Sequence, residues 1–530
     1  MIRALNYIQK QTRILQAYFR LSKSPFNSGN AFYSLSLDYA YNTKSIEELK
    51  MTIEETERYL AEDFNNASMA DLYYDLGSAY SNLNNLYYEL NDENNIPIIM
   101  RNIEKILKYY RLALSLFRNG ELKEDNHYIS SLKTSLYTNY ANLLVQLGRY
   151  AEGFKNYYDV LAYEPEFDIA KGLLGIALLR YSNASEPCLY TDTLKRYAST
   201  YLQQAIVSRH YQITDQTRKD FIEAYDSISV QLIESVNDTK HALENNRIKL
   251  DKKYRKWISN NHLFLSLLGD LEGVPMKYLV DDLRLPALKK LHDKEPAPIF
   301  FFLFNQLKYD YLYVRLKVYT SFINKKKKRL YLKDSYLTYT NDDSVFNVNV
   351  EDLKVAFALA YSVFDKIASF INLYFDLGIK STDVSFGSIW TNEKPGKNGY
   401  TYKHQLDYSH NMGLLCLYWI NRDCKDRFGL SLDPENKIIR ALRHANEHRF
   451  IMVHTRSDYS FKDEYKGVIT HITYDELEDY CLALLALTRE ALIALTIAVY
   501  EENCYRESDD NYTLNLDDAI ELGTIDGKDL

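Results

Sequence analysis

Three arginines and two histidines surround one glutamate in the short stretch "IIRALRHANEHRF", Ile438 to Phe450. A helix built only for packing needs none of these charged or titratable side chains. An imidazole, with an ordinary pKa of about 6.5, can accept or donate a proton at neutral pH. A guanidinium is a planar, permanently charged set of donors that suits anionic oxygens. The residue types therefore suit acid–base chemistry beside a bound anion.

The sequence predicts that one helix carries these side chains. Asp433 is in place to cap its N-terminus, and Pro434 stands at the first helical position. At about 100° per residue, apolar and polar side chains separate onto opposite faces. The face predicted to pack inward holds Ile438, Leu442, Ala445, Met452 and Val453. The outward face holds Arg440, Arg443, His444, Glu447, His448 and His454.

Two simpler interpretations compete with an acid–base site. Arg443 and Glu447 are four residues apart and could form an ordinary surface ion pair. His444 and His448 have the same spacing, which suits a metal as well as a shared anion. A zincin, however, needs Glu directly after its first His, whereas Ala445 stands there and no acidic third ligand has a recognised spacing. We therefore predict no metal and no cofactor.

The hexapeptide "RHANEH" resembles the signature of the HEPN superfamily (higher eukaryotes and prokaryotes nucleotide-binding). That signature is an arginine, a polar residue, three variable residues and a histidine, here Arg443, His444, the spacer 445–447 and His448. The phrases "LKVAFALAYSVFDKIASFINLYFDLGI" and "RHANEHRFIMVH" are similar to a prokaryotic HEPN subgroup in which the domain follows TPR-like repeats. The resemblance covers roughly residues 296–505. The departure is His444, because that position is most often Asn in the family.

Many HEPN proteins are metal-independent endoribonucleases, and the resemblance implies that reaction here. It assigns Arg443 to transition-state charge, His448 to proton transfer, and His444 to orienting the phosphate or the other imidazole. Asp365 could orient one of these groups, but an ordinary surface charge is the preferred interpretation. Supporting candidates are Asn446, Glu447 and His454. Because Arg443 and His448 lie about 140° apart on one helix, and HEPN domains characteristically dimerise, we expect a homodimer with a composite cleft.

Helical repeats are expected upstream. The stretch "LYTNYANLLVQLGRYAEGFKNYYDVLAYEPEF" matches the tetratricopeptide (TPR) pattern at Tyr137, Tyr140, Ala141, Gly148, Tyr150, Gly153, Tyr157, Val160 and Pro165. Gly175 takes the small-residue position one period of about 34 residues after Ala141. A looser unit surrounds Gly77. The concave surface of such an array usually binds a peptide or protein, although the repeats could equally be a scaffold for the C-terminal domain.

The predicted fold class is all-α, a TPR-like helical repeat array followed by a C-terminal HEPN-type helical bundle. Short β excursions are expected at "RLYLKDSYLTY" and "GVITHITY". We divide the chain into an N-terminal helical region (1–65), TPR-like repeats (66–185), a helical connecting region (186–295), a HEPN-like domain (296–505) and an acidic, solvated tail (506–530). Capping boxes are predicted at Ser45 with Glu48 and at Thr473 with Glu476.

Net charge, cysteine spacing and hydrophobicity limit the kind of RNA contact and the cellular location that are expected. A formal net charge of -8 argues against coating nucleic acid by bulk electrostatics, so any RNA contact must be local. The five cysteines form no C-x-x-C pair, which fits reduced thiols in a cytosol. Arg489 and Glu490 interrupt the apolar stretch from Leu482 to Tyr500, so we interpret it as a buried helix. The expected location is the cytoplasm, away from membranes.

Three hypotheses follow. The first is a TPR-regulated endoribonuclease, a toxin-like effector in prokaryotic anti-phage or stress defence, with RNA as substrate and a protein or peptide as the ligand of the repeats. The second is a non-catalytic TPR/HEPN adaptor that binds RNA or nucleotide and a protein partner. The third is a metal-dependent hydrolase, which loss of activity in EDTA would indicate.

Overall fold

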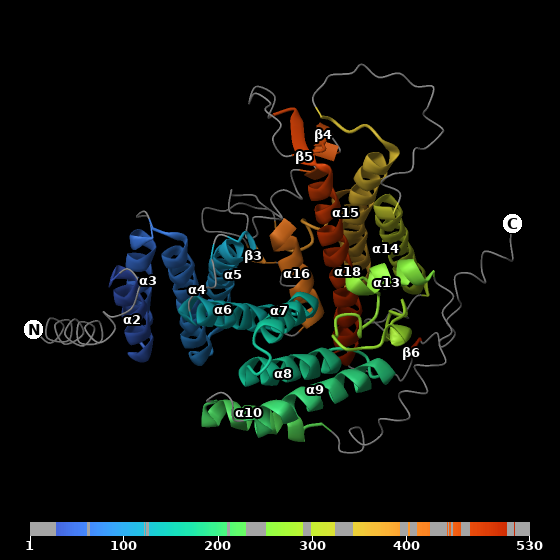
Figure 1. Cartoon of the computed structure of the whole chain (residues 1–530). Coiled ribbons are helices and arrows are strands. Elements are labelled where there is room, and N and C mark those ends of the chain that lie inside the picture. The colour runs from blue at the N-terminus through green and yellow to red at the C-terminus, as the bar shows by residue number, and fades with distance from the viewer. Residues whose placement is uncertain are drawn as a thin grey trace, which may run out of the picture. The chain divides into compact units, whose positions relative to one another are not determined.

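A computed structural model describes most of the chain (Figure 1). The described residues are 28–60, 64–120, 122, 127–208, 213–228, 251–289, 298–323, 343–392, 401–402, 411–424, 442–443, 445–446, 449–456, 467–505 and 513–514. Contacts divide the chain into unit 1 (Met1–Leu143, Ala162–Pro165 and Asp426–Asn436) and unit 2 (Leu144–Leu161, Glu166–Lys425 and Lys437–Leu530). The described elements are mainly helices with short strands, which confirms the predicted fold class.

Unit 1 is a succession of helices. They are α2 (Ser28–Asn42), α3 (Ile46–Tyr59), α4 (Asn66–Glu89), α5 (Ile96–Arg118) and most of α6 (His127–Gln146), with a short 3-10 turn η1 (Glu93–Asn95) between α4 and α5. The predicted cap of α3 is present, because the Ser45 hydroxyl accepts the Glu48 backbone N–H at 3.2 Å. Helices α4 and α5 pack closely, since a Cβ at Gly77 would collide with the Tyr110 ring.

Unit 2 begins near the turn before α7 (Tyr150–Tyr163), where Gly148 adopts a φ of +74°. Helices α8 (Asp168–Asn183), α9 (Leu189–Val207) and α10 (Asp215–Asp226) follow. Gly175 allows α8 and α9 to approach, because a Cβ there would lie 2.7 Å from Cγ of Leu202. The small residue thus has the packing role that the repeat pattern assigns to it. The helical N-terminal region is consistent with TPR-like repeats.

The connecting region is less helical than predicted. Its described part contains α9 and α10, then α13 (Lys252–Asn260), but residues 261–287 are irregular apart from a 3-10 turn, η2 (Met276–Tyr278). Gly269, Gly273 and Pro275 fall within this segment and disfavour a continuous helix. Backbone carbonyls of this segment accept hydrogen bonds from Arg489, as described below.

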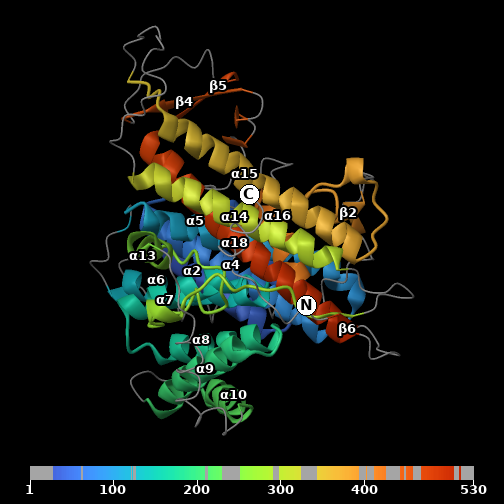
Figure 2. The same cartoon turned by 90° about the vertical axis from the view of Figure 1, so that its right-hand side faces the viewer.

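Helices α14 (Ile299–Ile323), α15 (Val348–Tyr374), α16 (Met412–Cys424) and α18 (Tyr474–Tyr505) form the C-terminal bundle. The apolar residues of α15 recur three and four residues apart, and those from Leu353 to Tyr374 in this series are buried. Asn347 caps that helix by accepting the Val350 N–H at 2.9 Å. Helix α14 runs antiparallel to α15, since Phe300 packs against Phe370 and Lys317 pairs with Asp352 (Figure 2).

Helix α18 is the central, buried helix of this bundle, as predicted from its interrupted apolar run. Both α15 and α18 are long and apolar enough to cross a membrane by length and composition, but 50% and 78% of their most apolar windows are buried inside the protein. The Thr473 capping box is confirmed: Glu476 accepts the Thr473 N–H at 2.8 Å, and the Thr473 hydroxyl accepts the Glu476 N–H at 3.2 Å.

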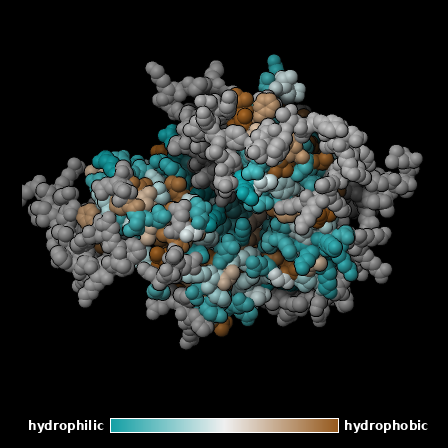
Figure 3. Space-filling model, turned by 45° about the horizontal axis from the view of Figure 1, so that its top comes forward, coloured by the Kyte–Doolittle hydropathy of each residue, from teal (hydrophilic) through white to brown (hydrophobic). Residues whose placement is uncertain are grey.

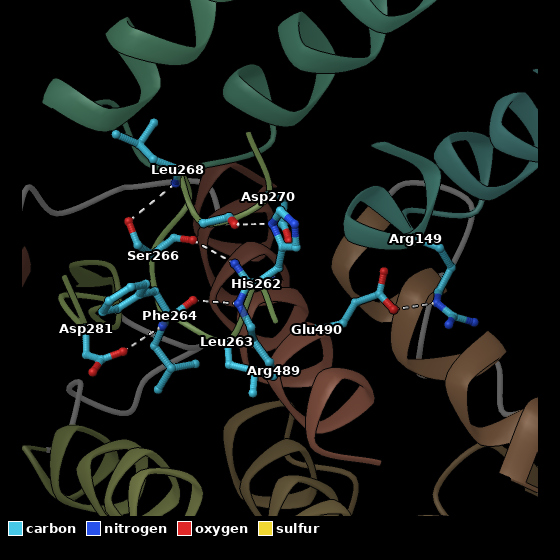
Figure 4. A network of polar contacts seen from close by, with 12 residues as sticks. Arg149, His262, Leu263, Phe264, Ser266, Leu268, Asp270, Asp281, Arg489 and Glu490 are labelled. Carbon is cyan, nitrogen blue, oxygen red and sulfur yellow. Dashed lines mark hydrogen bonds and ion pairs between the residues drawn. The ribbon is translucent and has the colours of Figure 1, made fainter. Parts of the chain in front are cut away.

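Two charged residues in the middle of α18 are buried, and each binds another element of unit 2 (Figure 4). Arg489 donates to Asp270 at 2.6 Å and to the carbonyl oxygen of Ser266 at 2.9 Å. Glu490 accepts a hydrogen bond from Arg149, next to the start of α7, at 2.8 Å. The charges that interrupt the apolar sequence therefore attach α18 to the irregular segment and to a repeat helix.

The strands are short. Strands β4 (Phe450–His454) and β5 (Ile469–Thr473) pair in parallel over five residues, which confirms the β excursion predicted at "GVITHITY". Strands β2 (Thr391–Asn392) and β3 (Thr401–Tyr402) form an antiparallel pair. Strand β1 (Leu288–Lys289) pairs with β6 (Thr513–Leu514), so these two residues of the predicted solvated tail are hydrogen-bonded to the rest of unit 2. The excursion predicted at "RLYLKDSYLTY" lies outside the described residues.

Candidate functional site

Arg443 is held between an aromatic ring and a carboxylate of α15. Its guanidinium carbon lies 4.1 Å from the centroid of the Tyr361 ring, within the range of a cation–π contact. Its Nη2 lies 3.7 Å from Oδ2 of Asp365. The Arg443 side chain remains 36% exposed. A fixed but accessible guanidinium is the arrangement that an anion-binding role requires.

Tyr361 and Asp365 are one helical turn apart on α15, so both reach the same side chain. Asp365 is itself positioned, because its Oδ1 accepts the backbone N–H of Phe386 at 2.9 Å. Burial raises the pKa of the Tyr361 hydroxyl above its ordinary value of 10.0, so the ring stays neutral beneath the guanidinium. Asp365 therefore contacts Arg443, and its orienting role remains a prediction.

The described fragments of the motif segment also attach to α15. Leu442 and Ala445 are buried, on the side predicted to face inward. Asn446 donates its side-chain N–H to the Lys354 carbonyl at 2.9 Å, which links the motif segment to α15. The Arg449 N–H donates to the Ala445 carbonyl at 2.9 Å, which is the last helical contact before β4.

Three predicted site residues, His444, Glu447 and His448, lie outside the described residues. The same holds for the predicted cap Asp433 with Pro434, and for Ile438 and Arg440. Their roles remain predictions from the sequence.

The prediction for His454 is wrong. It was placed on the outward face of a helix, but it ends strand β4 and its side chain is fully buried. Met452 and Val453 likewise lie on the strand and not on a helix face. The run Phe450 to Val453 is apolar with aromatic and β-branched residues, which favours a strand once a partner is available. The partner is β5, about twenty residues later, whose own strand character was visible in the sequence.

His454 pairs with a residue that the sequence did not single out. Its Nε2 lies 2.9 Å from Nδ1 of His471 on β5, and the two rings stack with centroids 5.2 Å apart. The separation fits a hydrogen bond in which one ring nitrogen donates its N–H to the other. Burial, and secondarily the neighbouring His454, lowers the pKa of His471 below its ordinary 6.5. The alternating stretch "VITHIT" was the only signal that His471 would face another strand residue.

This pair predicts a pH effect on stability. A histidine whose pKa is lowered by folding binds its proton more readily when unfolded, so its unfavourable contribution appears as the pH falls through about 6.5. We expect His471→Gln, which can still donate a hydrogen bond, to reduce the loss of the unfolding midpoint between about pH 7.5 and about pH 5.5 relative to wild type. Thermal unfolding followed by circular dichroism at both pH values measures this. Parallel pH dependences of the two proteins would contradict it.

Among the described residues, no group of three or more His, Cys, Asp or Glu side chains is arranged to hold a metal ion. The histidine pair His454 and His471 supplies only two such side chains, which contact each other at 2.9 Å.

Comparison with protein families places this site in a known domain. Residues 291–502 match the family described as LA2681-like HEPN. The chain contains a HEPN domain. The match spans α14 to α18 and includes Arg443, and it overlaps the HEPN-like segment predicted at 296–505. Comparisons with curated proteins and with solved structures found no match.

The HEPN assignment supports a role in RNA cleavage or in another nucleotide-related function. Within the described part of the domain, the arrangement of Arg443 suits a negatively charged ligand such as a phosphate group, since a guanidinium can donate two parallel hydrogen bonds to it. The predicted domain boundaries outside this match remain predictions.

Proposed function

We propose that the HEPN domain is a metal-independent endoribonuclease that acts as a homodimer in the cytoplasm. The observation that supports this most is the position of Arg443, anchored on Tyr361 and Asp365 of α15 yet still accessible. An anchored guanidinium loses little conformational freedom when it binds a phosphate, so more of the binding energy is available for the transition state.

In the proposed reaction the ribose 2′-oxygen attacks the adjacent phosphorus. The new bond joins the 2′-oxygen to phosphorus, and the bond from phosphorus to the 5′-oxygen of the next nucleotide breaks. One imidazole accepts the 2′-hydroxyl proton, and the leaving 5′-oxygen takes up a proton. His448 performs one of these transfers, His444 orients the phosphate or the second imidazole, and Arg443 stabilises the negative charge on the phosphorane. The products are a 2′,3′-cyclic phosphate and a 5′-hydroxyl.

The TPR-like region is proposed to bind a protein or peptide that controls this activity, and the whole protein to act as a toxin-like effector in prokaryotic anti-phage or stress defence. Regulation by a helical repeat array is a common use of its large binding surface. The adaptor hypothesis differs in a single respect: RNA or nucleotide would bind near Arg443 without being cleaved.

Sequencing of RNA ends distinguishes the endoribonuclease hypothesis from the adaptor hypothesis. Purified wild-type protein and His448→Ala are incubated with total RNA in EDTA, and the fragment ends are mapped. We expect new 2′,3′-cyclic phosphate ends with wild type, reduced about 100- to 10,000-fold in the variant because a proton-transfer group is lost. Wild-type protein that binds RNA without producing new ends would favour the adaptor, and equal cleavage by both proteins would remove His448 from the mechanism.

A further inference from the structure

Exposed hydrophobic residues are scattered over most of the described surface. On the face drawn in Figure 3, hydrophobic residues are interspersed among hydrophilic ones. Single exposed residues of this kind are normal for a folded protein. The small sheet of β4 and β5 differs, because exposed aromatic side chains occur there together with arginines of the motif segment. This sheet lies at the end of the bundle where α15 and α18 begin (Figure 1).

The strand register assigns the side chains of this sheet to two faces. Phe450 pairs with Ile469, and Met452 pairs with His471, two residues further along both strands. Because side chains alternate along a strand, all four lie on one face. Phe450 is 69% exposed, and the other three are half-buried. We call this face, with its four side chains, the β4–β5 platform.

The opposite face of the sheet packs inward. It carries Val453 and Ile472, which are both buried. The platform itself is closed at its far end, where His454 is buried and contacts His471. The accessible part of the platform is therefore the start of β4, which is the end nearest the motif.

A second exposed aromatic residue lies next to β4. Residues 343–345 run antiparallel to β4 along the edge that β5 does not occupy, and the Val345 N–H donates to the Val453 carbonyl at 2.7 Å. Phe346 follows directly and is 67% exposed. Rings that are this exposed contribute little to the core. Their flat faces remain available for stacking against a planar ligand.

Positive charge is concentrated in the same part of the chain. Residues 442–456 hold three arginines and one glutamate, whereas the whole chain has a formal net charge of -8. Arg449 and Arg456 flank β4 and are exposed, and neither forms an ion pair with a described residue. Exposed guanidiniums without acidic partners suit the phosphates of a nucleic-acid backbone.

The platform continues from the Arg443 site. Arg443 contacts the middle of α15, Asn446 contacts Lys354 nearer the start of that helix, and β4 pairs with residues that precede it. The motif segment thus runs along α15 toward the platform. The seven positions from Arg443 to Phe450 correspond to about 10 Å along a helix and to at most about 25 Å along any chain. An extended single strand of a few nucleotides can reach both residues.

We propose that the β4–β5 platform binds single-stranded RNA, with one base of the substrate stacked on Phe450 and a neighbouring phosphate held by Arg449. The inference rests on the proposed function, because it concerns how that site holds its substrate. Every base has a flat π-face, so stacking of this kind tolerates different base identities. Bases within a duplex are already stacked on one another, so the platform selects unpaired segments of RNA.

The test measures binding of a probe that cannot be cut by its own 2′-oxygen. The probe is a fluorescein-labelled single-stranded oligonucleotide with 2′-fluorine in place of every 2′-hydroxyl, and its anisotropy is followed during titration with full-length protein. Phe450→Ala should weaken binding by about 5- to 150-fold, the effect of losing one base–aromatic stack, with an unchanged circular dichroism spectrum. Phe450→Trp keeps a flat ring and should bind as tightly as wild type.

Two further variants separate stacking from other effects. Val468→Ala is the matched control, because Val468 is an apolar residue 51% exposed that precedes Ile469 and so lies on the opposite face. It should bind the probe like wild type. Arg449→Ala should weaken binding and lower the slope of log affinity against log salt by about 0.7, the value for one phosphate contact on a single strand.

Unchanged affinity in Phe450→Ala would overturn the proposal, as would an equal loss in Val468→Ala or equally tight binding of the probe as a duplex. A Phe450→Ala protein of half the wild-type mass in solution, with its RNA affinity intact, would identify the platform as a contact between chains instead.

Cleavage of unmodified RNA by the same proteins distinguishes this inference from the proposed function. Phe450→Ala should raise KM and leave kcat nearly unchanged, because the stack holds substrate and transition state equally. A wild type that binds the probe through Phe450 but cleaves no RNA would contradict only the proposed function. An active wild type whose affinity does not depend on Phe450 would contradict only the platform.

Discussion

Arg443→Ala is expected to lower the rate of RNA cleavage by about 100- to 1000-fold, because in the proposed mechanism its guanidinium stabilises the negative charge of the transition state. The protein should stay folded. The side chains of Arg443 and Asp365 are 36% and 40% exposed, and an ion pair between such exposed groups contributes little stability. Initial cleavage rates on a short RNA, with a circular dichroism melt of the same samples, measure both effects.

Two further variants show whether the position of the guanidinium matters in addition to its charge. Arg443→Lys keeps the charge but loses the planar fork, so it should recover only a small part of the activity. Tyr361→Leu keeps Arg443 but removes the ring 4.1 Å beneath it. We expect Tyr361→Leu to cleave more slowly than wild type with a smaller loss than Arg443→Ala. Full activity in both Arg443 variants would exclude this residue from the chemistry.

Arg149→Met is expected to destabilise unit 2 by about 3–5 kcal/mol, the usual effect of breaking a buried ion pair by removing one partner. Arg149 lies between three carboxylates, with Asp423 and Glu490 both at 2.8 Å and Glu152 at 2.7 Å. Only Glu152 is appreciably exposed, at 26%. Without the arginine, these acidic groups would face one another in a buried site. Urea unfolding followed by tryptophan fluorescence reports on unit 2, because all three tryptophans lie in it.

Two controls accompany this measurement. Lys354→Ala removes an ion pair with Glu351, whose carboxylate side chain is 63% exposed, and should cost under about 1 kcal/mol. Glu490→Gln removes one of three negative charges around a single arginine. Burial raises the pKa of Glu490 above its ordinary 4.5, so its charge is less stable in this site than in water, and the neutral amide should cost far less than Arg149→Met. Equal free energies of unfolding for wild type and Arg149→Met would contradict the structural role of the cluster.

Much of the helical architecture could be predicted from local sequence. The caps at Ser45 and Thr473 and the small residue Gly175 each depend on a few neighbouring residues, and the structure places all of them as expected. The irregular segment 261–287 was mistaken for helix. Its conformation is stabilised by a distant residue, Arg489, which binds its carbonyls from over two hundred positions away.

Prediction of the candidate site was limited in the same way, by contacts between segments far apart in the sequence. Arg443 was identified from its motif, but Tyr361, which supports it, is an unremarkable residue of an apolar helix until the two segments meet. His454 was placed on a helix because its spacing from Arg443 fits one, whereas pairing with β5 makes the segment a strand. Strand pairing depends on residues far apart in the sequence, and no periodicity within the motif helix could reveal it.

The most direct test of the proposed chemistry compares two oligonucleotides of the same sequence, one all-RNA and one with a single 2′-deoxynucleotide at the cleaved position, each incubated with full-length protein in EDTA. If the 2′-oxygen is the nucleophile, the RNA should be cut to a 2′,3′-cyclic phosphate and a 5′-hydroxyl, and the substituted strand should stay intact at that position. Cleavage of both strands at the same rate would contradict the proposed mechanism, and cleavage of neither would contradict the proposed activity.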